Sequence, residues 1–156
     1  MKISTQVRYG ARALIELAKT GSSKPVPIQW ISSRQEISPS YLEQLLASLK
    51  KANLVKSFRG PGGGYMLALP PAKISLNDIF IALEGKTEIM GCMKSQNPAC
   101  DRMEFCIMHL FWERFQDSLI NFLKSVTLET IVAQEQELFA RRGRPRRRRL
   151  KRRANK

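Results

Sequence analysis

Apolar residues recur every three or four positions in several stretches of the chain, which is the period of a helix with one buried face. The most regular stretch spans residues 39–51, where four leucines share one side: Leu42, Leu45, Leu46 and Leu49. Ser38 and Pro39 form a typical helix start, because serine caps free amides and proline needs no amide partner there. Asn53 suits the left-handed position that ends a helix. The pattern therefore predicts an amphipathic helix.

A short β-hairpin is expected directly after this helix. Residues 54–58 and 65–69 have strand character, and the loop between them has the sequence RGPGGG. A helix followed by a hairpin with an arginine-tipped loop indicates a winged helix, which places the helix in the major groove and the wing on the backbone or in the minor groove. A phosphate-binding loop is one alternative, but the required lysine spacing and the following helix are missing. An ordinary hairpin without function is another.

Helical patterns also flank this unit on both sides. We expect helices over residues 4–19 and 28–35 before it, and over residues 73–85, 107–126 and 128–139 after it. Ser75 with Asp78 predicts a capping box, and Thr127 predicts the start of the last helix. The expected fold class is mainly α with a small β-hairpin wing, that is, a winged helix-turn-helix domain plus a long dimerisation helix.

The long helix over residues 107–126 has apolar residues at alternating spacings of three and four, which is a heptad-like pattern. Its members are Met108, Phe111, Phe115, Leu119, Phe122 and Val126. Such a face can pack on its own domain, but the preceding elements already fill a small core. We therefore favour pairing with a second copy of the chain, centred on Phe111, Phe115, Leu119 and Phe122.

Positive charge is concentrated at the C-terminal end. Residues 141–156 hold 11 of the 27 lysines and arginines and no acidic residue, so residues 1–140 have a net charge of +3 against +14 for the whole chain. No apolar run is long enough to span a membrane, and the first residues do not form a signal peptide, so a cytoplasmic protein without membrane contact is expected.

All three cysteines lie close together, and the sole histidine follows them. The pattern is Cys92-x7-Cys100-x5-Cys106-x2-His109. Thiolates and imidazole suit zinc or an iron–sulfur cluster, and Cys106 and His109 are spaced to face one side of a helix. The spacing alone does not separate zinc from a cluster. Three unrelated free cysteines are the alternative. Because the only histidine is assigned to a metal, no catalytic nucleophile or acid–base pair is left, and we do not expect an enzyme.

Three segments resemble the IscR-type iron–sulfur regulators, which belong to the winged-helix family that also contains the nitric-oxide sensor NsrR. They are SRQEIS with SYLEQLL (residues 33–38 and 40–46), LVKSFRGPGGGY (residues 54–65) and the Cys-Cys-Cys-His set. The resemblance covers about residues 1–135. Seven residues separate Cys92 from Cys100, where the IscR pattern has five, and the polybasic tail is outside the family pattern.

The resemblance implies a homodimeric transcription regulator with one 2Fe–2S cluster per subunit, held by Cys92, Cys100, Cys106 and His109. It implies control of cluster-assembly genes, as repressor or activator, with a cluster-assembly scaffold as the cluster donor. The implied organisation is a DNA-binding domain over 1–85, a cluster-binding loop over 86–109, dimerisation helices over 107–140 and a disordered polybasic tail over 141–156. The alternatives are an NsrR-like nitric-oxide-sensing repressor and a regulator with structural zinc at the same ligands.

The expected DNA contacts lie on the amphipathic helix and the hairpin loop. They are Ser38, Ser40, Tyr41, Glu43, Gln44, Arg59 and Gly60. Gln44 suits adenine and Glu43 suits cytosine, while an arginine suits a narrow A/T-rich minor groove. In the family, a glutamate at the place of Glu43 restricts the sites that the cluster-free form accepts. Tyr41 could instead be a packing residue, and Arg59 a solvated loop charge.

The tail contains Arg142-Gly143-Arg144-Pro145, which is similar to the core of an AT-hook. Runs of like charge are usually solvated, and they raise non-specific affinity for nucleic acid. Electrostatic tethering to DNA, or contact with RNA, is therefore the favoured interpretation of the tail. The DNA partner expected for the whole protein is a pseudo-palindromic promoter site in double-stranded DNA.

Overall fold

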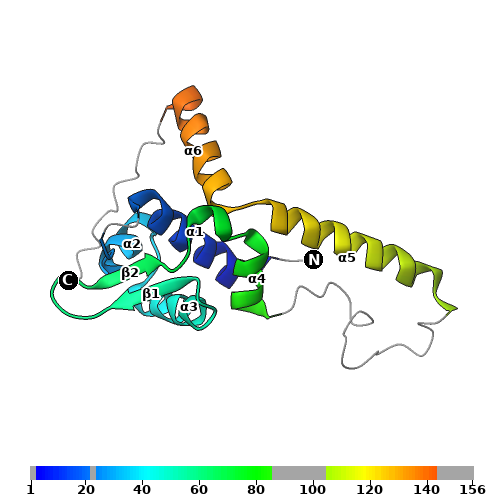
Figure 1. The fold of residues 1–156 in the computed structure, drawn as a ribbon, viewed down its shortest axis with the longest axis horizontal. Helices are drawn as coiled ribbons and strands as arrows, with labels where there is room; N and C mark the ends of the chain where they lie inside the picture. The colour runs from blue at the N-terminus through cyan, green and yellow to red at the C-terminus, as the bar shows by residue number, and fades with distance from the viewer. Residues whose placement is uncertain (1–2, 22–23, 86–104, 144–156) are drawn as a thin grey trace, which may run out of the picture.

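The structure, a computed structural model, describes residues 3–21, 24–85 and 105–143 (Figure 1). Cys92, Cys100, most of the expected cluster-binding loop and the polybasic residues beyond Gly143 lie outside the described residues. The elements in chain order are α1 (Thr5–Thr20), α2 (Ile28–Gln35), α3 (Pro39–Lys51), β1 (Val55–Phe58), β2 (Gly64–Leu67), the 3-10 turn η1 (Pro71–Lys73), α4 (Leu76–Glu84), α5 (Ile107–Ser125) and α6 (Leu128–Arg142). The predicted mainly helical fold with a small β-hairpin is confirmed.

The predicted helix starts form as hydrogen-bonded caps. The Ser38 hydroxyl accepts the Tyr41 backbone N–H at 3.4 Å, at the start of α3. At the start of α4, the Ser75 hydroxyl accepts the Asp78 N–H at 3.2 Å and the Asp78 carboxylate accepts the Ser75 N–H at 2.8 Å. Thr127 caps α6 in the same reciprocal way. These bonds satisfy amides that have no partner within the helix, so they fix where each helix begins.

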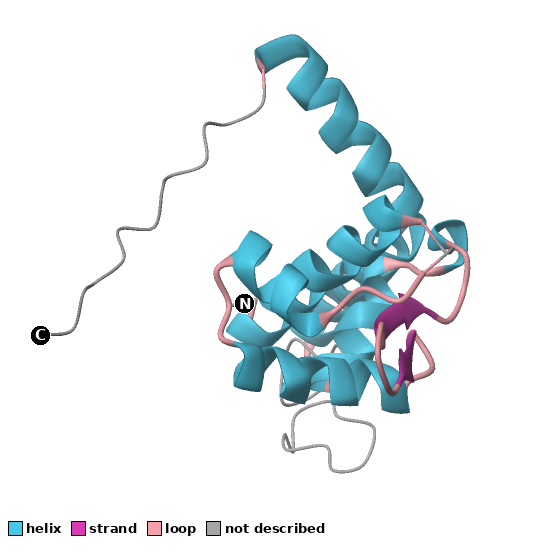
Figure 2. Cartoon of the chain, turned by 90° about the vertical axis from the view of Figure 1, so that its left-hand side faces the viewer, coloured by secondary structure: helices cyan, strands magenta, loops and turns pink. Residues whose placement is uncertain are grey.

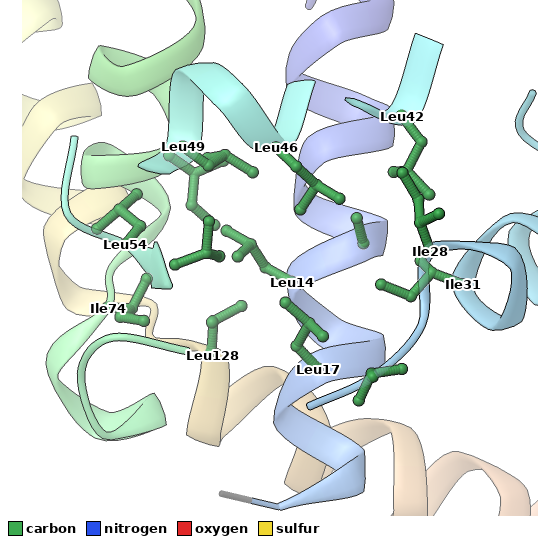
Figure 3. Close-up of a cluster of buried hydrophobic side chains, with 14 of the residues drawn as sticks. Leu14, Leu17, Ile28, Ile31, Leu42, Leu46, Leu49, Leu54, Ile74 and Leu128 are labelled. Atoms are coloured by element: carbon green, nitrogen blue, oxygen red, sulfur yellow. The ribbon is translucent and has the colours of Figure 1, made fainter. Parts of the chain in front are cut away.

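The leucine face of α3 forms one wall of the hydrophobic core (Figure 3). Leu42, Leu46 and Leu49 point toward side chains from five other parts of the chain. Those labelled in the figure are Leu14, Leu17, Ile28, Ile31, Leu54, Ile74 and Leu128. Because Leu128 belongs to α6, the core that supports α3 takes part of its packing from beyond the hairpin and α4.

The hairpin is slightly shorter than predicted and is extended by a third segment. Strands β1 and β2 pair antiparallel from Val55–Leu67 to Phe58–Gly64, so residue 54 and residues 68–69 are not strand residues. Residue 54 instead belongs to the end of α3: Asn53 has the predicted left-handed φ of 58°, and the Leu54 N–H after it donates to the Leu49 carbonyl at 2.9 Å. Val26, before α2, exchanges two backbone hydrogen bonds of 2.9 Å with Tyr65. The wing is therefore attached to the segment that enters α2.

The two C-terminal helices leave the body in different directions. In Figure 1, α5 extends to the right as a long helix, and both views show α6 rising away from the body (Figure 2). The junction between α5 and α6 is bound to the start of α4 by two backbone hydrogen bonds. The Leu76 N–H donates to the Val126 carbonyl at 2.8 Å, and the Leu128 N–H donates to the Ile74 carbonyl at 2.9 Å. None of the helices in the described ranges is long and apolar enough to cross a membrane.

We expect Gly64→Ala to destabilise the protein more than Gly10→Ala. A Cβ at Gly64 would lie 2.3 Å from the Val26 carbonyl oxygen, whereas a Cβ at Gly10 would meet the flexible end of Leu83 at 2.3 Å. Overpacking against backbone, with an unfavourable φ, should cost Gly64→Ala roughly 2–4 kcal/mol of unfolding free energy. Gly10→Ala should cost at most about 2 kcal/mol, because alanine is favoured within a helix. Urea unfolding measures both; equal midpoints would contradict the close contact between the wing and Val26.

Candidate nucleic-acid interface and candidate metal site

Helix α3 presents a polar face because its leucines are buried. Ser40, Glu43 and Gln44 are exposed, while Leu42, Leu45, Leu46 and Leu49 are buried. The exposed residues lie on the side of the helix away from the core, which follows from the 3.6-residue period. Hydroxyl, carboxylate and amide groups therefore face outward from one rigid element, at positions from which they could reach base edges.

Ser38 and Tyr41 at the start of α3 also have structural contacts. The Ser38 hydroxyl caps the helix, as described above. The Tyr41 ring is partly buried and meets the Tyr9 ring of α1 edge-on, with centroids 6.1 Å apart. Such edge-to-face pairs stabilise by roughly 0.5–1.5 kcal/mol beyond area burial. The packing interpretation of Tyr41 thus matches the geometry, and this residue can act on DNA only through the part of the ring that stays accessible.

Two α1 arginines near Tyr41 were missed by the sequence reasoning. The guanidinium groups of Arg8 and Arg12 lie 5.0 and 5.5 Å from the centroid of the Tyr9 ring. Arg8 is exposed, and the Tyr9 ring that it contacts meets the Tyr41 ring of α3. The only signal in the sequence was the i, i+4 spacing of the two arginines, which indicates a common helix face but not the neighbour of that face.

The hairpin loop places Arg59 and Gly60 in the open. Both residues are exposed, and Arg59 makes no ion pair with any residue in the described ranges. A polar groove of about 400 Å³ lies beside the loop. It is lined by Arg59, Gln29 and Lys50 among others. Lys50 donates to the Ser57 hydroxyl at 2.7 Å and so joins α3 to β1, a contact that helical spacing could not reveal.

Two of the four predicted metal ligands are described, and they lie at the start of α5. Cys106 is the N-cap residue and makes no side-chain cap bond, and the His109 N–H donates to the Cys106 carbonyl at 2.9 Å. The imidazole Nε2 lies 3.5 Å from Glu113 Oε1, while Nδ1 is buried without a hydrogen-bond partner among the described residues. A buried ring nitrogen without a hydrogen-bond partner, within one turn of a thiol, fits a metal or cluster ligand. No group of three candidate ligands occurs within the described ranges.

The predicted dimerisation face of α5 is largely open in the single chain. Phe111, Phe115 and Phe122 are 57%, 48% and 61% exposed, and Leu119 is partly buried. Leu123, near the C-terminal end of the helix, is buried, and α5 contacts α4. Exposed phenylalanines in a row on one helix are uncommon for a monomer, because large apolar patches usually mark an interface.

Comparison with known proteins matches residues 3–134 to the family described as "Rrf2: Iron-dependent Transcriptional regulator". The HTH-type transcriptional regulator IscR of Cronobacter sakazakii is 36% identical over 138 residues, which are 88% of this chain and 84% of that protein. The solved structure of CymR, the global cysteine regulator of B. subtilis, has a TM-score of 0.71 and 37% identity and covers 86% of this chain and 98% of its own. T. potens IscR has a TM-score of 0.71 and 36% identity, with 88% and 90% coverage. The winged-helix prediction is confirmed by these likenesses.

We expect Ser38→Ala to lower the free energy of unfolding by about 1 kcal/mol, because α3 loses its side-chain cap. Ser38→Asp should retain most of the parent stability, since aspartate caps a helix as well as serine. Ser40→Ala is the matched control, because Ser40 is exposed and makes no cap bond. Urea unfolding measures all three variants. If Ser38→Ala were as stable as Ser40→Ala, the cap would not hold the start of α3.

Proposed function

The chain belongs to the Rrf2 family of transcriptional regulators and is IscR-like. We propose that it acts as a homodimeric DNA-binding regulator of cluster-assembly genes. In this proposal it senses iron–sulfur status through a bound 2Fe–2S cluster. The observation that carries the DNA-binding part is the arrangement of α3 and the wing. A helix buried on one face only, with an exposed arginine loop beside it, is the geometry of a unit that reads a groove and grips the backbone.

Each exposed side chain has a distinct role in this proposal. Gln44 would bond adenine through its amide, and Glu43 would accept from the cytosine amino group while repelling misplaced phosphates. Ser38, Ser40 and the accessible part of Tyr41 would contact phosphates or base edges near the start of α3. Arg59, with Gly60 beside it, would enter an A/T-rich minor groove, where the negative potential is enhanced.

Dimerisation would place two such units on one DNA site. The exposed apolar face of α5, with Phe111, Phe115, Leu119 and Phe122, supports pairing of two α5 helices about a two-fold axis. Burying this face would remove large apolar side chains from water, and each Å² of apolar surface buried would stabilise the dimer by about 25 cal/mol. Two recognition helices related by a two-fold axis require a pseudo-palindromic site with half-sites about one turn (~34 Å) or a multiple apart.

The cluster would be held by Cys92, Cys100, Cys106 and His109. Occupancy of this site by a 2Fe–2S cluster would depend on the supply of iron and sulfide and on oxidation of the cluster. The chain's own contribution is to place a thiol and an imidazole at the start of α5, with the free Nδ1 of His109 available for ligation. Since the same helix bears the dimerisation face, ligation at its start could alter how the two copies pair. Glu43 would then determine which promoter sites the cluster-free form accepts.

Arg59→Ala should weaken binding about tenfold to a duplex with A/T-rich flanks, and less with G/C-rich flanks, since a minor-groove arginine responds to groove width. The test uses a duplex selected by the parent protein from a randomised library, with binding measured by fluorescence anisotropy at several salt concentrations. The slope of log affinity against log salt should fall by about one. Lys124→Ala, which removes an exposed cation from the last turn of α5, is the control. Equal losses for both variants would mean that Arg59 acts only as a solvated charge.

Cys106→Ala and His109→Ala should lose the visible absorption of protein purified without oxygen, whereas the parent should contain about two irons and two sulfides per chain. Met108→Leu, in the same turn, is the control and should resemble the parent. One zinc per chain in colourless parent protein would replace the sensing mechanism with a structural site. A larger cluster would favour an NsrR-like sensor. Neither result would affect the DNA-binding part of the proposal.

A further inference from the structure

One buried carboxylate joins α1 to the end of α2. Glu16, on α1, is only 3% exposed. Its Oε2 accepts from Arg34 Nε at 2.5 Å, and its Oε1 accepts from Gln35 Nε2 at 2.7 Å. Arg34 and Gln35 are the last two residues of α2. A carboxylate removed from water needs such donors, because an uncompensated buried charge is strongly unfavourable. Glu16 therefore requires the end of α2 to stay in one position.

A second anchor from α1 fixes the same residue. Arg12 donates through Nε to the Gln35 side-chain oxygen at 2.7 Å and through its terminal nitrogen to the Gln35 backbone carbonyl at 2.8 Å. The Gln35 amide thus accepts from Arg12 and donates to Glu16, so both of its polar atoms are used. With Arg12 on one side and Glu16 on the other, the side chain and the backbone of Gln35 are held at once.

Gln35 lies immediately before the turn into α3. Glu36 follows Gln35 with a left-handed φ of 56°, which is uncommon for a residue other than glycine. The next residues are Ile37, which is buried, and Ser38, the N-cap of α3. Ser32 donates its hydroxyl to the Ile37 carbonyl at 2.6 Å and closes the turn from the α2 side. The orientation of α3 therefore depends on where α1 holds Gln35.

The same carboxylate is connected to the C-terminal helix. Lys19 donates to Glu16 Oε1 at 3.3 Å and also pairs with Glu135 of α6. The connection runs from α6 through Lys19 to Glu16 and from there to Arg34 and Gln35. It links the helix that follows α5 to the turn before α3, across the α1 side of the body.

We propose that Glu16 is a positioning residue for DNA recognition: it holds the turn that orients α3, and Lys19 with Glu135 extends this hold to α6. The proposal rests on the proposed DNA-binding function. Positioning predicts a particular outcome. Loss of the network should misplace the base-reading residues of α3 and so reduce the affinity for a specific site. Affinity for non-specific DNA, which depends on charge and not on register, should change little.

The test measures both affinities for the full chain. The specific probe is a duplex of about 30 base pairs, roughly three helical turns, that the parent selects from a randomised library, and the non-specific probe is poly(dI-dC). Glu16→Gln keeps the shape of the side chain but replaces one carboxylate oxygen with an NH₂ group. This donor then faces Arg34 Nε or Gln35 Nε2, which are donors themselves. All measurements are made well below each variant's unfolding midpoint, so a merely structural role would leave the ratio of the two affinities unchanged.

We expect Glu16→Gln to lose about tenfold or more in specific affinity, with non-specific affinity within about twofold of the parent. Glu135→Gln should lose about threefold in specific affinity, because a partly exposed ion pair contributes less than a buried one. Glu137→Gln makes the same charge change on an exposed residue of the same helix that forms no ion pair with any described residue, and it is the matched control. If Glu16→Gln does not fold, the comparison of Glu135→Gln with Glu137→Gln decides.

An unchanged ratio of specific to non-specific affinity in Glu16→Gln would overturn the proposal, as would equal effects of Glu135→Gln and Glu137→Gln. These outcomes are distinct from failure of the proposed function. If the parent enriches no sequence from the library, sequence-specific DNA binding itself fails. If the parent enriches a sequence and Glu16→Gln discriminates equally well, only the positioning role fails.

Discussion

The burial of one face of α3 is the constraint on which the rest of the molecule depends. Leu42, Leu46 and Leu49 occupy the core, so the helix cannot rotate without exposing apolar surface. That anchoring is what keeps Glu43 and Gln44 turned outward. The wing and the C-terminal helices then attach to the same core, through Val26 on one side and through Ile74 and Leu128 on the other.

The parts of the structure that the sequence predicted are those determined by local rules. Helical periodicity and capping residues defined α3 and α4, and the arginine–glycine loop indicated the wing. Contacts between distant elements could not be predicted in this way. Nothing in the spacing of Glu16 indicated that it is buried beneath Arg34 and Gln35, because that position depends on how α1 packs on α2.

The candidate sites also differ in how far local patterns in the sequence could identify them. The DNA-contact residues follow from the amphipathic pattern of one helix and its neighbouring loop, so they could be named from the sequence. The metal ligands were suggested by residue type and spacing, and the orphaned Nδ1 of His109 is consistent with that set while Cys92 and Cys100 lie outside the described residues. The polar network at Glu16 adds a physical connection between the C-terminal helix and the turn before α3.

In the proposed function, two copies of the chain present two α3 helices to one DNA site. The most direct test is to let the full chain select duplexes from a randomised library and to map protection of the selected DNA by hydroxyl-radical footprinting. We expect a pseudo-palindromic sequence with two protected half-sites about one helical turn, or a multiple of it, apart. Enrichment of no sequence, or of one unrepeated half-site with a single protected segment, would contradict it.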